Sequence, residues 1–464
     1  MIAQLAAALA PLSDHYPLPF CADLKQHEIG RVGAASITAR GERLLIPRMG
    51  PVAEVLAAGF RGRGILAEAL PMPDREAIRM GRRHTSGKEC VPMAITLGSV
   101  LQRLERERET TERFSIFMPS ANGPCRFGVY HVLYKMTLER LGWADRVSVW
   151  SPVDEDYFEG QPGGFSIVVC SGFAVADVLL AALYDSRPVE AHKGDADEIY
   201  ARYSAELHGL IEATARRAPA LPAALLQVAN GGLFGCASLL QRAAAEFAAI
   251  KRERDLPTVL VVGEIYVRCD PASNDFVVEQ LERRGLRARF APFGEWLEYT
   301  DLSNRIEGLS NAFGDAITER VRRRIYDLTY RVAAGPLAWP ERATPAHALA
   351  AAEGYLSDRL VGEPILTVGG AVHEWRHGLI DGVVNVGPLE CMPTKIAEAQ
   401  LFHAAEKEGL CALTLELNGD PLDPVVLDNF AFDIKARHHA RGQAAAARRD
   451  PSSNAVAAVA VASA

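Results

Sequence analysis

The segment TVLVVGEIYV (258–267) is a run of β-branched and other apolar residues that is typical of a buried strand. It is followed by NDFVVEQLERRG (274–285), which has the apolar spacing of a helix and ends at a glycine. RARFAPF (287–293) then has the pattern of a second strand. Strand, helix and strand in this order form the unit from which parallel sheets are built. The segment therefore predicts an α/β fold.

The same alternation continues on both sides of this segment. Four strand patterns with helical patterns between them lie nearer the N-terminus, namely RLLIP (43–47), GILAEALP (64–71), RFSIFMPS (113–120) and RVSVWSP (146–152). Three further strand patterns follow helical inserts, namely PILTVGG (364–370), DGVVNVGP (381–388) and CALTLEL (411–417). Two parallel sheets, each covered by helices, are expected from these two stretches.

A chain of 464 residues is long enough for more than one domain. We expect two α/β domains that face one another across a cleft. The expected segments are an N-terminal helix and loop (1–42), a first α/β domain (43–190), a helical connector (191–256), a second α/β domain with a helical insert (257–435) and a disordered tail (436–464). For the tail, a helical end is the alternative.

Charge and composition exclude several classes of protein. The net charge of -8 argues against a nucleic-acid partner. We find no apolar run of roughly 18 residues and expect no membrane span, and the N-terminus lacks the basic region of a secretory signal. The eight cysteines form no Cys-x-x-Cys pair, which disfavours disulfide scaffolds and zinc ribbons. A cytoplasmic protein is expected.

Three cysteines share one kind of surrounding sequence. Cys90 lies in GKECVPMAITLG, Cys125 in NGPCRFGVYHV and Cys391 in GPLECMPTKIAEA. In each we read a strand, a turn with Gly or Pro, the cysteine and then a helix. Proline two residues after Cys90 and Cys391 suits a first helical turn. The pattern predicts that each thiol lies at a helix N-terminus, on the edge of the sheet where ligands collect.

A helix N-terminus lowers the pKa of a nearby thiol, so three such cysteines predict three thiolates. Soft thiolates favour iron–sulfur clusters, zinc or copper(I) over hard cations. A cubane core of charge +2 with three thiolates would carry -1, which helix dipoles and Arg126 would offset, and one iron would stay open. Because the cysteines are 35 and 266 residues apart, two domains must meet to form the site.

The alternative is that these cysteines are small buried apolar residues. We assign that role to the remaining cysteines, among them Cys411 in a strand pattern. A double-cubane cluster would need a second group, formed by Cys170, Cys236 and Cys269.

The segments around the three cysteines, together with VVGEIYVRCDPASNDFVVEQLERRG (261–285), resemble a known family. They are similar to the acyl-CoA dehydratase activase-related iron–sulfur proteins, which are related to 2-hydroxyacyl-CoA dehydratase subunits and double-cubane cluster proteins. The resemblance covers roughly residues 43–435. It implies Rossmann-like domains that hold a [4Fe-4S] cluster through Cys90, Cys125 and Cys391.

The resemblance also implies low-potential electron transfer for reductive or radical chemistry on a CoA thioester, as an oxidoreductase or lyase component. An ATP-dependent activase supplies the electron, and we expect it on a separate chain because we find no activase domain in this sequence. A non-catalytic electron carrier, or a cluster-bearing partner of an activase, is the alternative. A homo- or heterodimer is left open, and no catalytic residue can be named.

Two charged motifs have competing interpretations. HEWRH (373–377) fits the zinc protease pattern through His373, Glu374 and His377, with Glu398 as a conceivable third ligand. Because glycines flank it, we expect no stable helix there and no zinc hydrolase. The charged residues of GRRHTSGKE (81–89) could bind a CoA phosphate or an acidic partner, or form a solvated loop.

Overall fold

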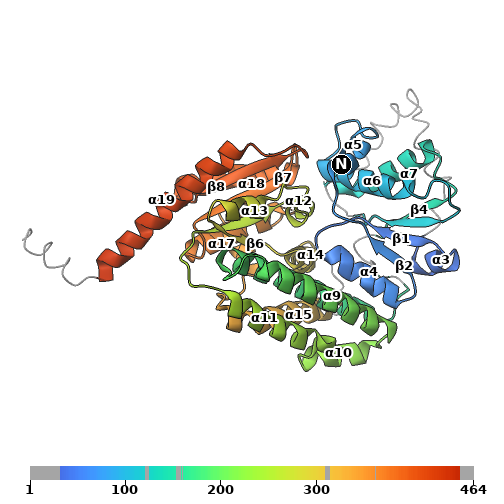
Figure 1. Cartoon of the computed structure of the whole chain (residues 1–464), viewed down its shortest axis with the longest axis horizontal. Helices are drawn as coiled ribbons and strands as arrows, with labels where there is room; N and C mark the ends of the chain where they lie inside the picture. Colours follow the sequence, from blue (N-terminus) through green and yellow to red (C-terminus); the bar gives the residue numbers. More distant parts are fainter. Residues whose placement is uncertain are drawn as a thin grey trace, which may run out of the picture.

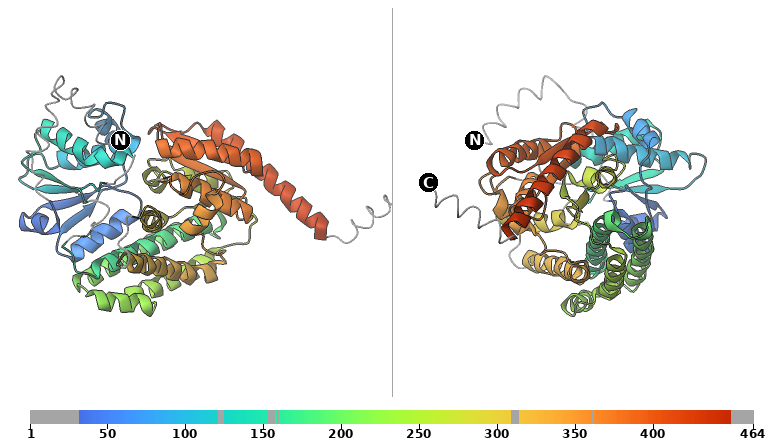
Figure 2. Two further views of the ribbon diagram at one scale, coloured as in Figure 1. Left: turned by 180° about the vertical axis from the view of Figure 1, so that it is seen from behind. Right: turned by 60° about the vertical axis from the view of Figure 1, so that its left-hand side comes forward.

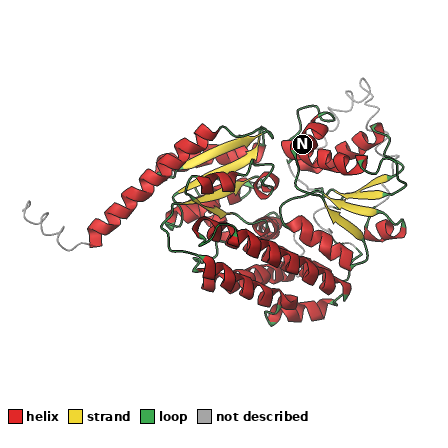
Figure 3. Ribbon diagram, in the orientation of Figure 1, coloured by secondary structure: helices red, strands yellow, loops and turns green. Residues whose placement is uncertain are grey.

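The protein contains two four-stranded sheets, and every strand pair in both sheets is parallel (Figures 1 and 3). The computed structural model describes residues 32–120, 125–152, 158, 160–308, 314–360 and 362–449. The predicted α/β class with two Rossmann-like domains is confirmed. The expected helix at the start of the chain and Cys21 lie outside the described residues.

The first sheet has the order β2-β1-β3-β4. Its strands are β1 (Arg43–Ile46), β2 (Leu66–Ala69), β3 (Phe114–Phe117) and β4 (Val147–Trp150). The helices around it are α3 (Ala34–Ala39), α4 (Val52–Gly62), α5 (Arg75–Arg82), α6 (Val91–Glu105), the short η1 (Arg126–Val129) and α7 (Tyr130–Arg140). The central strand β3 is buried along its whole length, as expected for a sheet with helices on both faces.

The second sheet has the order β6-β5-β7-β8. Its strands are β5 (Thr258–Gly263), β6 (Arg287–Phe290), β7 (Gly382–Pro388) and β8 (Ala412–Leu417). Its helices are α12 (Ile265–Cys269), α13 (Val277–Arg283), α14 (Gly294–Ile306), α16 (Pro345–Ala352), α17 (Pro364–Arg376), α18 (Met392–Glu408) and α19 (Pro424–Arg449). The central strand β7 is completely buried.

Both sheets arrange their strands in the same way. In each, the first strand in the chain lies between the second and the third, and the fourth forms an edge. In the first sheet, β2 is added on one side of β1, and β3 and β4 are added on the other side. The second sheet does the same around β5, so the order of the strands reverses between β1 and β3 and between β5 and β7. In doubly wound sheets, ligands bind outside the carboxyl ends of the strands at such a point.

A layer of helices packs against both sheet domains (Figures 1 and 2). It consists of α8 (Phe165–Ser186), α9 (Asp195–Arg216), α10 (Leu221–Ala229), α11 (Cys236–Ile250) and α15 (Gly314–Leu337), with the short turns η2 (Arg187–Val189) and η3 (Leu233–Gly235). Helix α8 contacts α4 of the first domain and β6 of the second. The layer is larger than the expected connector (191–256). It begins earlier, with α8, and it includes α15, which comes from the insert of the second domain.

Two helical segments are long and apolar enough for a membrane span by length and composition alone, although the sequence analysis found no apolar run of that length. They are Phe165–Val189 and Leu233–Ile250, and the apolar window of the first is 83% buried inside the protein. Helix α8 is apolar on all sides because neighbouring helices and a sheet surround it. Packing therefore accounts for its composition.

Three local predictions are wrong. PILTVGG (364–370) belongs to helix α17, and Cys90 follows helix α5 and a loop instead of a strand. Residues 436–449, expected in a disordered tail, continue helix α19, which extends away from the rest of the protein (Figure 2). Gly369 lies within helix α17 at its contact with α16. A Cβ at this position would lie 1.9 Å from the carbonyl oxygen of Ala348, so glycine is needed for the two helices to pack this closely.

Candidate functional site

One arginine side chain joins the three cysteine segments. Arg126 follows Cys125 directly, and its guanidinium donates to the carbonyl oxygen of Lys88 at 2.7 Å and to that of Glu390 at 2.6 Å. These carbonyls lie two residues before Cys90 and one residue before Cys391. The structure therefore brings together three cysteine-containing segments that are far apart in the sequence.

Each cysteine precedes a helix as its N-cap residue. Cys90 caps α6, Cys125 caps η1 and Cys391 caps α18, all with extended backbone angles. Cys90 and Cys391 are buried, whereas Cys125 is exposed. Glu390, directly before Cys391, has a φ of 59°, a left-handed conformation that non-glycine residues rarely adopt. Such conformations are concentrated at functional sites.

The surroundings raise the pKa of each thiol, whereas the sequence predicted lowered values. Desolvation by surrounding protein atoms is the largest cause at all three, including Cys125, whose thiol is largely surrounded although the residue as a whole is exposed; it raises the pKa of Cys391 to about 11. The carboxyl group of Glu264 acts in the same direction at each thiol, while the Arg126 guanidinium lowers the pKa of Cys90. Burial and nearby carboxylates thus outweigh the helix N-termini. Metal binding at such a site would displace thiol protons.

Two glutamates of the second domain lie near the three thiols, and the sequence analysis missed both. Glu264 follows β5, and its carboxylate accepts from the backbone N–H groups of Tyr266 at 3.2 Å and Val267 at 2.9 Å. Glu363 is the N-cap residue of α17, and its Oε1 accepts from the N–H of Ile265 at 2.8 Å. Burial raises the pKa of both carboxyl groups. A lone glutamate at the end of a strand or before a helix gives no distinctive sequence signal.

Two hydroxyl groups lie beside the buried thiols. The Tyr130 side chain is 5% exposed, and burial and the neighbouring Cys90 raise its pKa well above the usual value. The hydroxyl of Thr394 hydrogen-bonds with the thiol of Cys391 and lowers its pKa. Both hydroxyl groups therefore interact with a proposed ligand.

Within the described ranges, no three His, Cys, Asp or Glu side chains surround one point in a way that could hold a metal ion. The three cysteines that Arg126 brings near one another are soft donors, and soft donors favour soft metals and iron–sulfur clusters over hard cations.

The other cysteines lie in separate environments. Cys170 in α8 is close to Arg322 of α15, Cys236 begins α11, and Cys269 ends α12 next to Arg268. They come from three different helices. Cys411, directly before the edge strand β8, is half-buried.

The histidine motif lies on a continuous helix, which corrects the expectation that its glycines break the helix. Helix α17 contains His373 and Glu374 and ends at His377. Glu374 is buried and pairs with Arg289 at 2.8 Å, while the ring of His373 stacks on His347 at 5.0 Å and contacts His377. Glu374 is thus engaged in an ion pair, and the conceivable third ligand Glu398 pairs with Lys395 at 3.2 Å.

The charged loop before Cys90 takes part in a contact between the two domains. Arg82 donates to the carbonyl oxygen of Asn418 and pairs with Asp420 at 3.4 Å. A cavity of about 320 Å³ lies beside this contact, between the start of α5 and the loops at 272–276 and 419–421. Arg82, the last residue of α5, is therefore an interdomain contact.

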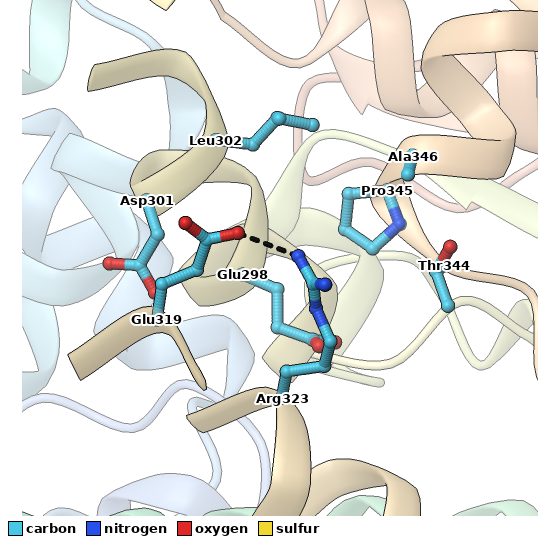
Figure 4. A pocket seen from close by; sticks show the side chains of 8 residues that line it. All are labelled: Glu298, Asp301, Leu302, Glu319, Arg323, Thr344, Pro345 and Ala346. Carbon is cyan, nitrogen blue, oxygen red and sulfur yellow. Dashed lines mark hydrogen bonds and ion pairs between the residues drawn. The ribbon is translucent and has the colours of Figure 1, made fainter. Parts of the chain in front are cut away.

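A smaller cavity of about 120 Å³ lies among α14, α15 and the start of α16 (Figure 4). Its carboxylates already have arginine partners. Glu298 pairs with Arg342 at 2.6 Å, and Glu319 pairs with Arg323 at 2.6 Å. The cavity thus lies within a network of ion pairs and shows no charge that calls for a ligand.

Comparison with known proteins adds no family assignment: no family model and no curated protein matches the chain. The resemblance described above therefore remains a prediction from the cysteine segments.

Proposed function

We propose that the protein is a cytoplasmic [4Fe-4S] protein that transfers low-potential electrons in ATP-dependent reductive or radical chemistry. The proposed ligands are Cys90, Cys125 and Cys391, and the proposed substrate is a CoA thioester of the 2-hydroxyacyl type. The observation that carries the proposal is the pair of hydrogen bonds from Arg126 to Lys88 and Glu390, which gathers the three cysteine segments at one place.

The residues around the thiols have distinct roles in this proposal. Arg126 fixes the two loops that end in Cys90 and Cys391 and offsets negative charge. Tyr130 covers Cys90 on the side of the first domain. When bound, the cluster supplies one electron, and the burial of two of its three ligands disfavours added charge and therefore favours a low reduction potential.

The second candidate is an electron carrier that does not act on a substrate itself. The exposure of Cys125 favours it, because an exposed ligand would let an electron pass to a partner protein at short distance. In both cases the electron donor is an activase on a separate chain.

A turnover experiment distinguishes the two candidates. The reconstituted protein would be reduced with titanium(III) citrate in place of the activase and mixed with lactoyl-CoA, 2-hydroxyglutaryl-CoA or phenyllactoyl-CoA. Saturable formation of the corresponding enoyl-CoA, absent in Cys125→Ser, is expected for the enzyme. Stoichiometric electron transfer to methyl viologen without any enoyl-CoA would instead identify a carrier, and failure of both reactions would contradict the proposed function.

A further inference from the structure

The two sheet domains are built in the same order, so that residues of one domain have equivalents in the other. Because both sheets have the same strand order, β3 corresponds to β7, and the helix before each of them also corresponds. Cys125 follows β3 and Cys391 follows β7, each as the cap of the next helical segment. These two thiols are therefore equivalent residues of the two domains, and they meet at one site.

The same correspondence assigns a partner to Cys90. Cys90 caps α6, the helix that precedes β3, and the helix that precedes β7 is α17, which is capped by Glu363. Both helices have a proline in the first turn, Pro92 in α6 and Pro364 in α17. The site thus consists of two equivalent pairs, in which the second domain presents a carboxylate where the first presents a thiol.

Glu363 also lies close to the proposed ligands. Its charge acts on the thiols of Cys125 and Cys391, which follow the two equivalent strands. Its Oε1 accepts a hydrogen bond from the N–H of Ile265. The side chain is therefore oriented by the start of α12, beside the carboxyl group of Glu264, whose charge raises the pKa of Glu363.

We infer that Glu363 is the fourth protein ligand of the cluster, binding the iron that the three cysteines leave open. This inference rests on the proposed function. A carboxylate oxygen is a harder donor than a thiolate and binds iron in such a cluster more weakly. The fourth position is then occupied in the resting protein but can be exchanged for an oxygen atom of a substrate.

Glu264 is the obvious competitor for this role. It is close to all three thiols, but both of its carboxylate oxygens accept backbone N–H groups of α12. It also follows β5, so its equivalent in the first domain lies after β1 and carries no proposed ligand. Glu264 therefore serves as a helix cap, and Glu264→Gln tests the competing assignment at a carboxylate of the same charge.

The test measures how readily the fourth iron leaves. The wild type, Glu363→Gln, Glu363→Cys and Glu264→Gln would be reconstituted with iron and sulfide and oxidised mildly with ferricyanide. The three-iron form would then be followed by electron paramagnetic resonance. We expect Glu363→Gln to lose the fourth iron at least about 10-fold faster than the wild type, because a ligand has been removed. Glu363→Cys should lose it more slowly than the wild type, and Glu264→Gln should lose it more slowly than Glu363→Gln.

The outcomes separate this inference from the proposed function. If the wild type and Glu363→Gln bind a full cluster and lose iron at the same rate, Glu363 is not a ligand, although the cluster is present. Faster loss in Glu264→Gln alone would move the role to that residue and overturn the inference. If the wild type binds no iron at all, both the inference and the proposed function fail. Circular dichroism of each variant checks that it folds.

Discussion

Replacing Cys90, Cys125 or Cys391 singly by serine is expected to remove most of the bound iron, whereas Cys411→Ser should retain it. Serine is similar in size to cysteine but offers a hard, poorly ionised oxygen in place of a soft thiolate, which iron–sulfur clusters accept badly. Cys411 is half-buried, directly before an edge strand, and is not one of the three proposed ligands. The measurement is iron and sulfide per chain after anaerobic reconstitution.

The same series tests the alternatives. A near-normal iron content in all three serine variants would show that Cys90, Cys125 and Cys391 are not the ligands. Loss of iron in those three and also in Cys170→Ser, Cys236→Ser and Cys269→Ser would indicate the double-cubane cluster. The first pattern, with loss in the three primary variants only, is the expected one, because Arg126 joins the three segments that carry those cysteines.

Gly263→Ala should cause the largest loss of stability near the site. Gly263 ends β5 with a φ of +121°, and a Cβ there would lie 1.9 Å from the carbonyl oxygen of Val386 in β7. That carbonyl accepts the N–H of Glu264 at 2.9 Å, so the two central strands would have to separate where the thiols meet. Strain and overpacking together should lower the free energy of unfolding by about 2–6 kcal/mol.

Gly409→Ala is the control for this variant. Gly409 also has a positive φ, +71°, but a Cβ there would meet no atom within 4 Å. Its substitution should cost only about 1 kcal/mol. Urea denaturation of both variants measures the difference, and equal losses would show that the contact with Val386 has no energetic importance.

The strands and the positions of Cys125 and Cys391 could be predicted from sequence because both depend on local patterns. Buried parallel strands give short apolar runs, and the carboxyl ends of such strands lie on one edge of a sheet. PILTVGG (364–370) was misassigned because a short apolar run does not distinguish a buried helix from a strand. Its Gly369 fits tight helix packing, which depends on Ala348 in another helix.

The rest of the site depends on tertiary contacts that no local pattern reveals. Glu264 and Glu363 reach the thiols only after both sheets have formed, and the equivalence of Glu363 with Cys90 requires the strand order. The direction of the thiol pKa values was also predicted wrongly. A helix N-terminus can be inferred from sequence, whereas burial and the nearby carboxylates cannot.

The most direct measurement is the iron and acid-labile sulfide content of the wild-type protein purified without oxygen, together with electron paramagnetic resonance of the dithionite-reduced or titanium(III)-reduced sample. The proposed site predicts about four iron and about four sulfide per chain and the signal of a reduced [4Fe-4S] cluster. Protein that reaches full purity and folds normally, yet binds no iron after reconstitution or holds one zinc ion at these cysteines instead, would contradict it.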